Sequence, residues 1–252
     1  KTGAEIVRIE MPAPLVSEEE IVDLVSSHIT PRTRVCSFSH VCTITGLVMP
    51  LAQISEITRP RDILLVCDGA QAPGMLDVNV RDLAVDSYAA SSHKWMLAPK
   101  GTGLLYIREG VQDRIRPLFL HSGYGAYTAS SGTRNVATLL AHGVAMGFHN
   151  TIGRDKVEGR CRELQTRLRT QLDEMDSFTV LTPRKEALYA GIVTISLKEG
   201  DFREVRRVML DDHGFVLKTG KTEYNAIRIS THIFNSEDDV DRLVEALKEV
   251  GA

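Results

Sequence analysis

Residues 65–106 read LVCDGAQAPGMLDVNVRDLAVDSYAASSHKWMLAPKGTGLLY, and this stretch decides the fold. It opens inside an apolar run typical of a buried strand, and that run ends at the turn-forming pair Asp68-Gly69. A second apolar segment, 87–90, leads into Ser91-Ser92-His93-Lys94-Trp95, and a third, 103–107, follows a glycine-rich turn. Ligands of open α/β sheets bind at the carboxyl ends of the strands. We therefore expect an acid, hydroxyls, an imidazole and a lysine to gather at one edge of a sheet.

The segments around this stretch alternate between strand and helix patterns. Ser17 followed by Glu20 is a capping-box signature that predicts a helix start, and Pro50 suits the start of another helix. Strand, helix and strand in succession with short loops indicate a parallel sheet with helices on its faces. The expected strands of this part are 5–9, 34–38, 63–67, 87–90 and 103–107, and the expected helices are 17–27, 51–58 and 136–149.

The C-terminal part has a different pattern. After a long helix at 155–175, shorter strands and helices alternate, which predicts a small α+β domain. The overall prediction is an α/β chain with a three-layer, mostly parallel large domain at 1–150 and a smaller α+β domain at 151–252. Its expected strands are 178–182, 191–197, 215–218 and 226–230, and its expected helices are 202–212 and one opened by Ser236.

Composition excludes several functional classes. The 252 residues carry 33 acids and 30 basic residues, and no basic stripe indicates a nucleic-acid binder. The longest apolar stretches fall short of the roughly 18 residues that a membrane span needs. The chain has four cysteines without C-x-x-C spacing, which predicts core thiols rather than a metal site and favours a cytoplasmic location.

Three motifs in order carry a family resemblance. They are Asp68-Gly69-Ala70-Gln71, Ser91-x-His93-Lys94 and Ala98-Pro99-Lys100-Gly101-Thr102-Gly103. Each motif alone is weak, but in this order they resemble the class V aminotransferase family of pyridoxal 5'-phosphate (PLP) enzymes. The His93-Lys94-Trp95 sequence is most similar to the isopenicillin N epimerase branch. The resemblance implies the fold type I PLP-dependent transferase architecture.

The resemblance implies roles for three residues around a PLP ring. Lys94 would be the Schiff-base lysine, although a lysine beside Trp95 can also lie along an indole at the surface. Asp68 would hold the pyridine nitrogen protonated; the alternative is a turn-forming aspartate. Gln71 would donate a hydrogen bond to the ring's phenolic oxygen, or would only be a polar loop residue.

The resemblance implies that four further residues bind anionic groups of the cofactor or the substrate. Ser91 and His93 would bind the cofactor phosphate, or would be polar surface. Thr133 would reach the phosphate of the neighbouring subunit, a role compatible with an ordinary N-cap. Arg228 would bind the substrate α-carboxylate, since it stands alone between Ile227 and Ile229 on a predicted strand; a surface arginine is the alternative.

The expected function is that of a PLP-dependent enzyme acting at the Cα of an amino acid through a Lys94 aldimine, epimerase-like or C–S lyase-like. Transamination and a truncated, non-catalytic PLP fold that only dimerises are the alternatives. The family's desulfurases carry a nucleophilic cysteine before the carboxylate-binding arginine, whereas the stretch 218–225 has none. The family also has an N-terminal portion that would precede Lys1, so we expect a fragment, a split protein or an incomplete sequence. A homodimer is expected, and no metal.

Overall fold

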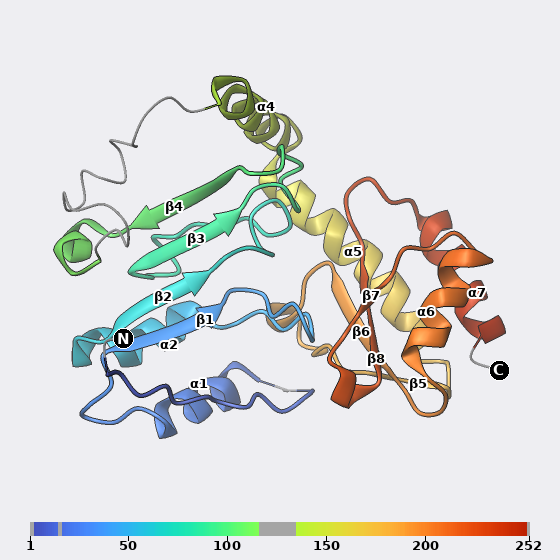
Figure 1. Ribbon diagram of the computed structural model, residues 1–252, viewed down its shortest axis with the longest axis horizontal. Coiled ribbons are helices and arrows are strands. Elements are labelled where there is room, and N and C mark those ends of the chain that lie inside the picture. Colours follow the sequence, from blue (N-terminus) through green and yellow to red (C-terminus); the bar gives the residue numbers. More distant parts are fainter. Residues whose placement is uncertain (1–2, 15–16, 116–134, 251–252) are drawn as a thin grey trace.

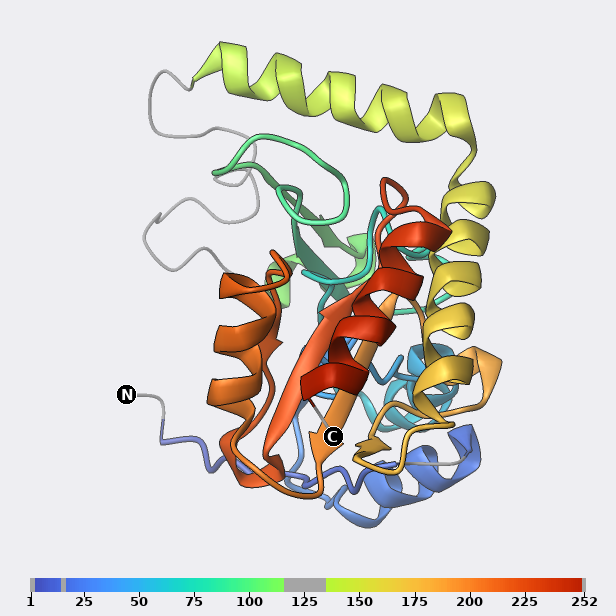
Figure 2. The ribbon, with the colours of Figure 1, turned by 90° about the vertical axis from the view of Figure 1, so that its right-hand side faces the viewer.

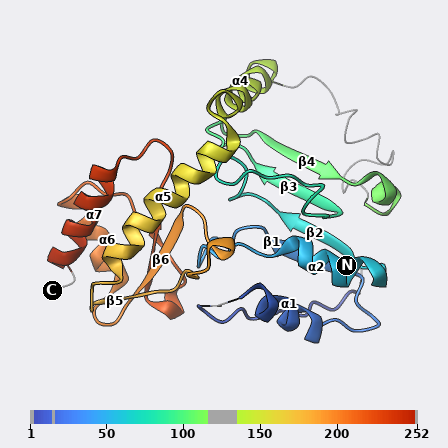
Figure 3. The same ribbon diagram turned by 180° about the vertical axis from the view of Figure 1, so that it is seen from behind.

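The computed structural model describes residues 3–14, 17–115 and 135–250 (Figure 1). Two four-stranded sheets lie side by side, and the long helix α5 runs past both (Figure 1, Figure 3). The first part of the chain contains β1 (Val35–Ser39), β2 (Leu64–Asp68), β3 (Ser87–Ser91), β4 (Gly103–Ile107), α1 (Glu18–Ser27), α2 (Leu51–Thr58) and α4 (Val136–Ile152). The second contains α5 (Arg154–Leu172), β5 (Phe178–Val180), β6 (Ile192–Leu197), α6 (Phe202–Asp211), β7 (Lys218–Thr219), β8 (Ala226–Ser230) and α7 (Glu237–Val250).

The first sheet has the order β1-β2-β3-β4, in which β1, β2 and β3 are parallel and β4 is antiparallel to β3. Helices α1 and α2 cover one face. Ile21 and Ile54 of these helices pack in one cluster with Leu65, Cys67 and Tyr88 of the strands. Because side chains alternate along a strand, the neighbouring residues of β2 and β3 point to the other face.

That other face is only partly covered among the described residues: Leu64 and Ile107 are buried there against Val111, whereas the end of the sheet beside Asp68 is open. The register places Ser39, Asp68 and Ala89 in one row across three strands, and all three are exposed. Val35 and Leu105, at the outer strands of the same face, are 52% and 48% exposed. The Asp68 side chain therefore stands on an open sheet surface lined by small residues.

The second sheet is antiparallel, with the order β5-β6-β8-β7. Helices α5, α6 and α7 pack on one of its faces (Figure 2). Ile227 and Ile229 of β8 are buried in this core, so Arg228 and Ser230 between and after them point the opposite way. That opposite side faces the first sheet.

A smaller cluster joins the two halves. Trp95 packs there with Met75 of the first part, with Cys161 of α5 and with Ile192 of β6. This packing fixes the first sheet's strand ends against the second sheet. The division of the chain at residue 150 into two domains stays a prediction.

Most expected elements are present within a few residues of their predicted bounds. The Glu20 amide donates to the Ser17 hydroxyl at 3.1 Å, which confirms the predicted cap of α1.

The prediction of a strand at 5–9 is wrong: that segment is extended without pairing, and Ile6 is 79% exposed. Alternating apolar and polar residues do not make a strand by themselves, because the segment must also pair with the edge of a sheet. The predicted strand at 215–218 is largely lost as well, since only Lys218–Thr219 pair with β8. The irregular segment expected at 118–132 lies outside the described residues.

Gly69 should not tolerate a side chain. A Cβ built there would lie 2.0 Å from Cε1 of Tyr88, which is fully buried. We expect Gly69→Ala to destabilise the fold by about 3 kcal/mol or more, because the Tyr88 ring has no free space to move into. Urea denaturation followed by circular dichroism measures the effect.

The matched control is Gly159→Ala at an exposed position of helix α5, where an added Cβ meets nothing within 4 Å. That change should stabilise by up to about 1 kcal/mol through helix propensity. Equal effects of the two substitutions would contradict the steric role of Tyr88.

Candidate functional site

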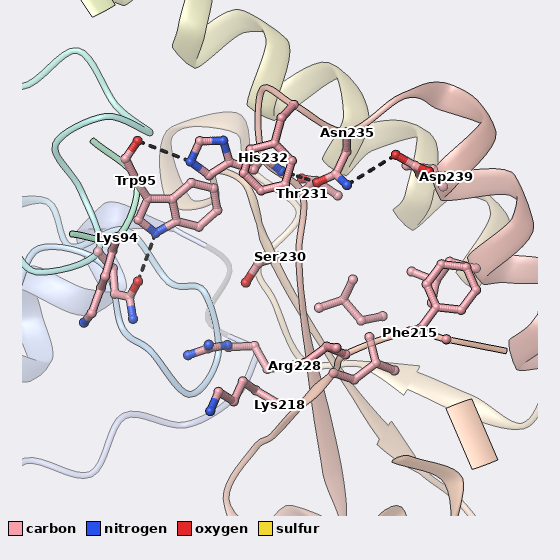
Figure 4. Close-up of a pocket in the computed structure, with 18 residues that line it drawn as sticks. Lys94, Trp95, Phe215, Lys218, Arg228, Ser230, Thr231, His232, Asn235 and Asp239 are labelled. Carbon is pink, nitrogen blue, oxygen red and sulfur yellow. Dashed lines mark hydrogen bonds between the residues drawn. The ribbon is translucent and has the colours of Figure 1, made fainter. Parts of the chain in front are cut away.

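A cavity of about 620 Å³ lies between the two sheets (Figure 4). From the first part of the chain it is lined by Gln71, Lys94 and Trp95. From the second it is lined by β7 and β8, which contribute Lys218 and Arg228 among others. Three of its wall residues are thus cations, one from the first sheet's strand ends and two from the second sheet.

Lys94 lies in the turn that follows β3. The turn is closed by backbone hydrogen bonds, among them Leu97 N to the Lys94 carbonyl at 3.2 Å and Ala98 N to the Ser92 carbonyl at 3.0 Å. The Lys94 side chain is exposed, and its ammonium forms no ion pair with any described residue. Buried Trp95 follows it immediately, so the turn fixes where the amine emerges.

A chain of hydrogen bonds connects the two sides of the cavity. Trp95 Nε1 donates to Gln71 Oε1 at 2.9 Å, and Gln71 Nε2 donates to the Thr43 hydroxyl at 3.1 Å. Arg228 Nη1 donates to the same hydroxyl at 2.5 Å and to the Thr43 carbonyl at 3.3 Å. The predicted residues Gln71 and Arg228, far apart in sequence, are therefore linked through one threonine.

Arg228 is a cation without an acid. Its Nε is buried and has no hydrogen-bond partner, and no carboxylate of the described residues pairs with its guanidinium. Burial lowers the pKa of Arg228 from its ordinary value. A partly desolvated guanidinium on a cavity wall, with no carboxylate partner among the described residues, is suited to take up a carboxylate or another anion.

The aromatic end of the cavity is a stack of three rings (Figure 4). His232 lies parallel to Trp95 at a centroid distance of 5.1 Å and to Phe234 at 4.3 Å. His232 Nε2 donates to the Trp95 carbonyl at 3.2 Å, which fixes its tautomer, and burial lowers its pKa to about 4. The imidazole is therefore neutral near pH 7 and holds Trp95 in place.

Asp68, Ser91 and His93 do not line this cavity. Asp68 lies at the end of β2, where its Oδ1 accepts from Ala70 N at 2.9 Å, and its exposed carboxylate pairs with no described cation. Ser91 ends β3 opposite Gly103, on the same open face as Asp68. His93 is exposed in the turn beside Lys94. The site residues thus form two adjoining sets, one on the open sheet face and one in the cavity.

The remaining residues considered for the site lie outside the cavity or outside the described residues. Thr133 lies outside the described residues. His40, in the loop after β1, is buried and shares a 2.9 Å hydrogen bond with Tyr88, so its role is structural. Ser92, which the motif leaves unassigned, is fully buried with an unpartnered hydroxyl. The family resemblance places the loop 39–46 beside the site but does not single out Thr43 within it. Sequence reasoning missed Lys218, because nothing local marks a short-strand lysine as facing a cavity.

Neither a metal site nor a membrane-crossing helix is found in the part of the chain that the structure describes. Within residues 3–14, 17–115 and 135–250, no three His, Cys, Asp or Glu side chains are grouped so as to hold a metal ion. In the same ranges, no helix combines the length and the apolar character that crossing a membrane requires.

Known proteins match nearly the whole chain. The profile of the family described as Aminotransferase class-V matches residues 1–243. An isopenicillin N epimerase of Amycolatopsis lactamdurans is 34% identical over 94% of this chain and 65% of its own length. A probable cysteine desulfurase of Halalkalibacterium halodurans is 26% identical over 98% of this chain and 65% of its own.

A solved structure has the same fold. A mutant of C-DES with glycine covalently linked to its PLP cofactor superposes with a TM-score of 0.81 at 24% identity, over 90% of this chain and 63% of that one. The predicted fold type is therefore confirmed. This chain spans less than two thirds of the length of each of these three proteins.

The stability of the fold should fall as the pH drops below about 6.5. Burial lowers the pKa of both His40 and His232 from 6.5 to about 4. As the pH falls, the unfolded chain binds protons at these histidines before the folded chain does. The free energy of unfolding that is present above pH 6.5 is therefore lost as the pH falls toward 4. The full loss is roughly 3 kcal/mol per histidine. Chemical denaturation at several pH values measures this loss, and an NMR titration of the imidazole protons assigns it. Midpoints near 6.5 for both rings would contradict their neutral buried state.

Trp95 should tolerate loss of its N–H better than loss of its ring. Trp95→Phe keeps a ring against His232 but removes the donor to Gln71, and we expect a loss of about 1 kcal/mol. Trp95→Ala also opens a cavity in the cluster that joins the two sheets, with an expected loss of roughly 4 kcal/mol. Urea denaturation of both variants tests this order, and equal losses would assign all of the effect to the hydrogen bond.

Proposed function

This chain belongs to the class V aminotransferase family, and from that membership we propose that the protein is a PLP-dependent enzyme that acts at the Cα of an amino acid. Epimerase-like or C–S lyase-like chemistry is preferred to transamination. The observation that carries the proposal is that Lys94, Gln71 and Arg228 converge on one cavity at the strand ends of the first sheet.

The residues present fit the cofactor. Asp68 offers a carboxylate without a cationic partner, on a sheet face where Ser39 and Ala89 leave room for a flat ring. A pyridinium nitrogen is the partner that this acid lacks. Ser91 and His93 add a hydroxyl and an imidazole for the phosphate, next to Lys94. When bound, PLP would withdraw electrons from the substrate's Cα and weaken its bonds.

Lys94 would hold the cofactor's aldehyde carbon and would move a proton at Cα. Both tasks need an amine that can lose its proton and that has no competing carboxylate. The Lys94 ammonium meets the second condition, since no described acid pairs with it. The turn closed by the Ser92 and Lys94 carbonyls keeps the base of this side chain fixed.

Arg228 and Gln71 would orient the substrate and the ring. The guanidinium of Arg228 would bind the α-carboxylate, and this would fix which bond of Cα faces the ring. Gln71 has its carbonyl taken by Trp95, so its amide N–H groups are directed toward Thr43 and the cavity. Trp95 and Thr43 therefore act as positioning residues.

The cysteines argue against persulfide chemistry. The four cysteines are Cys36, Cys42, Cys67 and Cys161, and none of them lines the cavity. Burial raises the pKa of Cys67 and of Cys161 to about 12, which disfavours the nucleophilic thiolate. Proton movement at Cα, as in an epimerase, fits these residues better than attack by a thiolate on a substrate sulfur.

A homodimer and a cytoplasmic location belong to the same proposal. Helix α4 exposes Val136, Leu140 and Val144 at 59%, 68% and 73%, an apolar surface that suits a subunit contact. Thr133, just before this helix in sequence, would reach the phosphate site of the second subunit. Four free cysteines suit a reducing compartment.

Borohydride reduction of the protein with PLP tests the proposal. We expect peptide mapping to place a phosphopyridoxyl group on Lys94 and not on Lys218, the other lysine of the cavity wall. The Lys94→Arg variant keeps the charge and should lose the label. Labelling of Lys218, or of no lysine in a protein that binds PLP, would contradict the assignment and favour a non-catalytic fold.

Exchange of the Cα proton in D₂O gives a test that does not depend on the final product. Nuclear magnetic resonance of an amino-acid panel should detect deuterium at Cα for at least one member. Lys94→Arg should slow this exchange by about 10²- to 10⁴-fold, the usual contribution of a positioned base. Exchange that persists at the same rate in the variant would rule Lys94 out as that base.

A further inference from the structure

We propose that Lys218 forms a second acid-binding subsite beside Arg228, so that the substrate is an amino acid with a second acid group on its side chain. This inference rests on the proposed function, in which Arg228 takes the α-carboxylate. Nothing in the sequence motifs points to Lys218. Its position on β7 is what brings it to the cavity.

The two cations are direct neighbours. Lys218 of β7 is the register partner of Arg228 of β8 in an antiparallel pair, so both side chains leave the same face of the sheet. Both line the cavity, and both extend toward the side where Lys94 lies (Figure 4). A ligand that reaches Lys94 therefore passes within reach of two cations.

Neither cation is neutralised by the protein. No described acid forms an ion pair with Lys218, Arg228 or Lys94. Asp239, the acid on the cavity wall, is engaged as a helix cap: it accepts from Ser236 N at 2.9 Å and from Asn235 Nδ2 at 3.4 Å. By contrast Lys221, three residues after Lys218, lies 3.9 Å from Glu223.

Like charges placed directly across a sheet destabilise it. Lys218 is exposed, so an uncharged side chain would also fit at this position. The protein nevertheless keeps the repulsion between Lys218 and Arg228. A bound anion removes the repulsion. One guanidinium edge is enough for one α-carboxylate, so the second cation indicates a second acid group.

The wall beside Lys218 is apolar. Phe215, Val216 and Leu217 precede it on the same segment and line the cavity, and Val216 is 80% exposed. Such a surface suits the methylene groups of a ligand's side chain. The chemical class that matches both features is an amino acid whose apolar side chain ends in a carboxylate.

Dicarboxylates without an amine test the subsite apart from the cofactor chemistry. We would titrate adipate and hexanoate, two six-carbon acids that differ by one carboxylate, into the protein with PLP. Trp95 is the one tryptophan of the chain and lines the cavity, so its fluorescence reports binding, and calorimetry gives a second measurement. We expect adipate to bind more tightly than hexanoate.

The decisive variant is Lys218→Met, which keeps the apolar stem and removes the charge. It should weaken adipate by about 10- to 100-fold, the range for one charged hydrogen bond, and change hexanoate less than about 3-fold. Lys218→Arg should keep most of the adipate affinity. Lys221→Met, in the same segment but off the cavity, is the matched control and should change neither. Without ligand, Lys218→Met should melt at a higher temperature, since it removes the repulsion with Arg228.

Equal losses of adipate and hexanoate in Lys218→Met would overturn the inference, because the two cations would then share one carboxylate. Equal affinity of the unsubstituted protein for both acids would overturn it too. Failure of the proposed function gives a different result from failure of this inference. If the proposed function were wrong, borohydride would leave Lys94 unlabelled, while the preference for adipate and its dependence on Lys218 would remain.

Discussion

The buried indole of Trp95 is the contact on which the site depends. It packs in the cluster that joins the two sheets, and its N–H holds Gln71, which in turn meets Thr43 and through it Arg228. Glycines on both sides make room for it. A Cβ at Gly74 would lie 2.4 Å from the Trp95 backbone, and one at Gly191 would lie 3.1 Å from the ring. The distance between Lys94 and the second sheet is therefore set by close packing and not by a loop.

The first sheet separates structure from chemistry by its two faces. On the covered face, Tyr88 fills the space beside Gly69 and meets His40, so the turn after Asp68 can accept only glycine. On the open face, the same strands present Asp68, Ala89 and Ser91. A one-residue slip of β2 would exchange the faces and bury the Asp68 carboxylate in an apolar core. Packing of the covered face thus fixes the register that the site needs.

The sequence predicted local elements better than contacts between residues that are far apart in the chain. Strands with clear apolar runs and capped helices were found because those signals are local: the bounds of β4 and β8 agree with the prediction, and Ser17 caps α1. The segment at 5–9 failed because pairing depends on an edge that alternation cannot report. Lys218 was not identified, and Thr43 was not singled out within the loop 39–46, since their importance comes from contacts across the chain: Arg228 Nη1 reaches Thr43 from 185 residues away.

Unbalanced charge is the feature that unites the cavity. Three cations face it while its one wall acid caps a helix, and the adjoining sheet face carries Asp68 as an acid without a cation. Among these groups Arg228 is the partly buried one, and a desolvated charge without a partner costs free energy, whereas Asp68, Lys94 and Lys218 are exposed. Here the partners cannot meet, because Asp68 ends β2 on the open face whereas Arg228 and Lys218 project from the second sheet. A ligand that carries a protonated ring nitrogen at one end and acid groups at the other would satisfy both sets at once. Under the proposed function, the same separation that leaves the charges unpaired in the protein would set the order in which cofactor and substrate groups lie along the site.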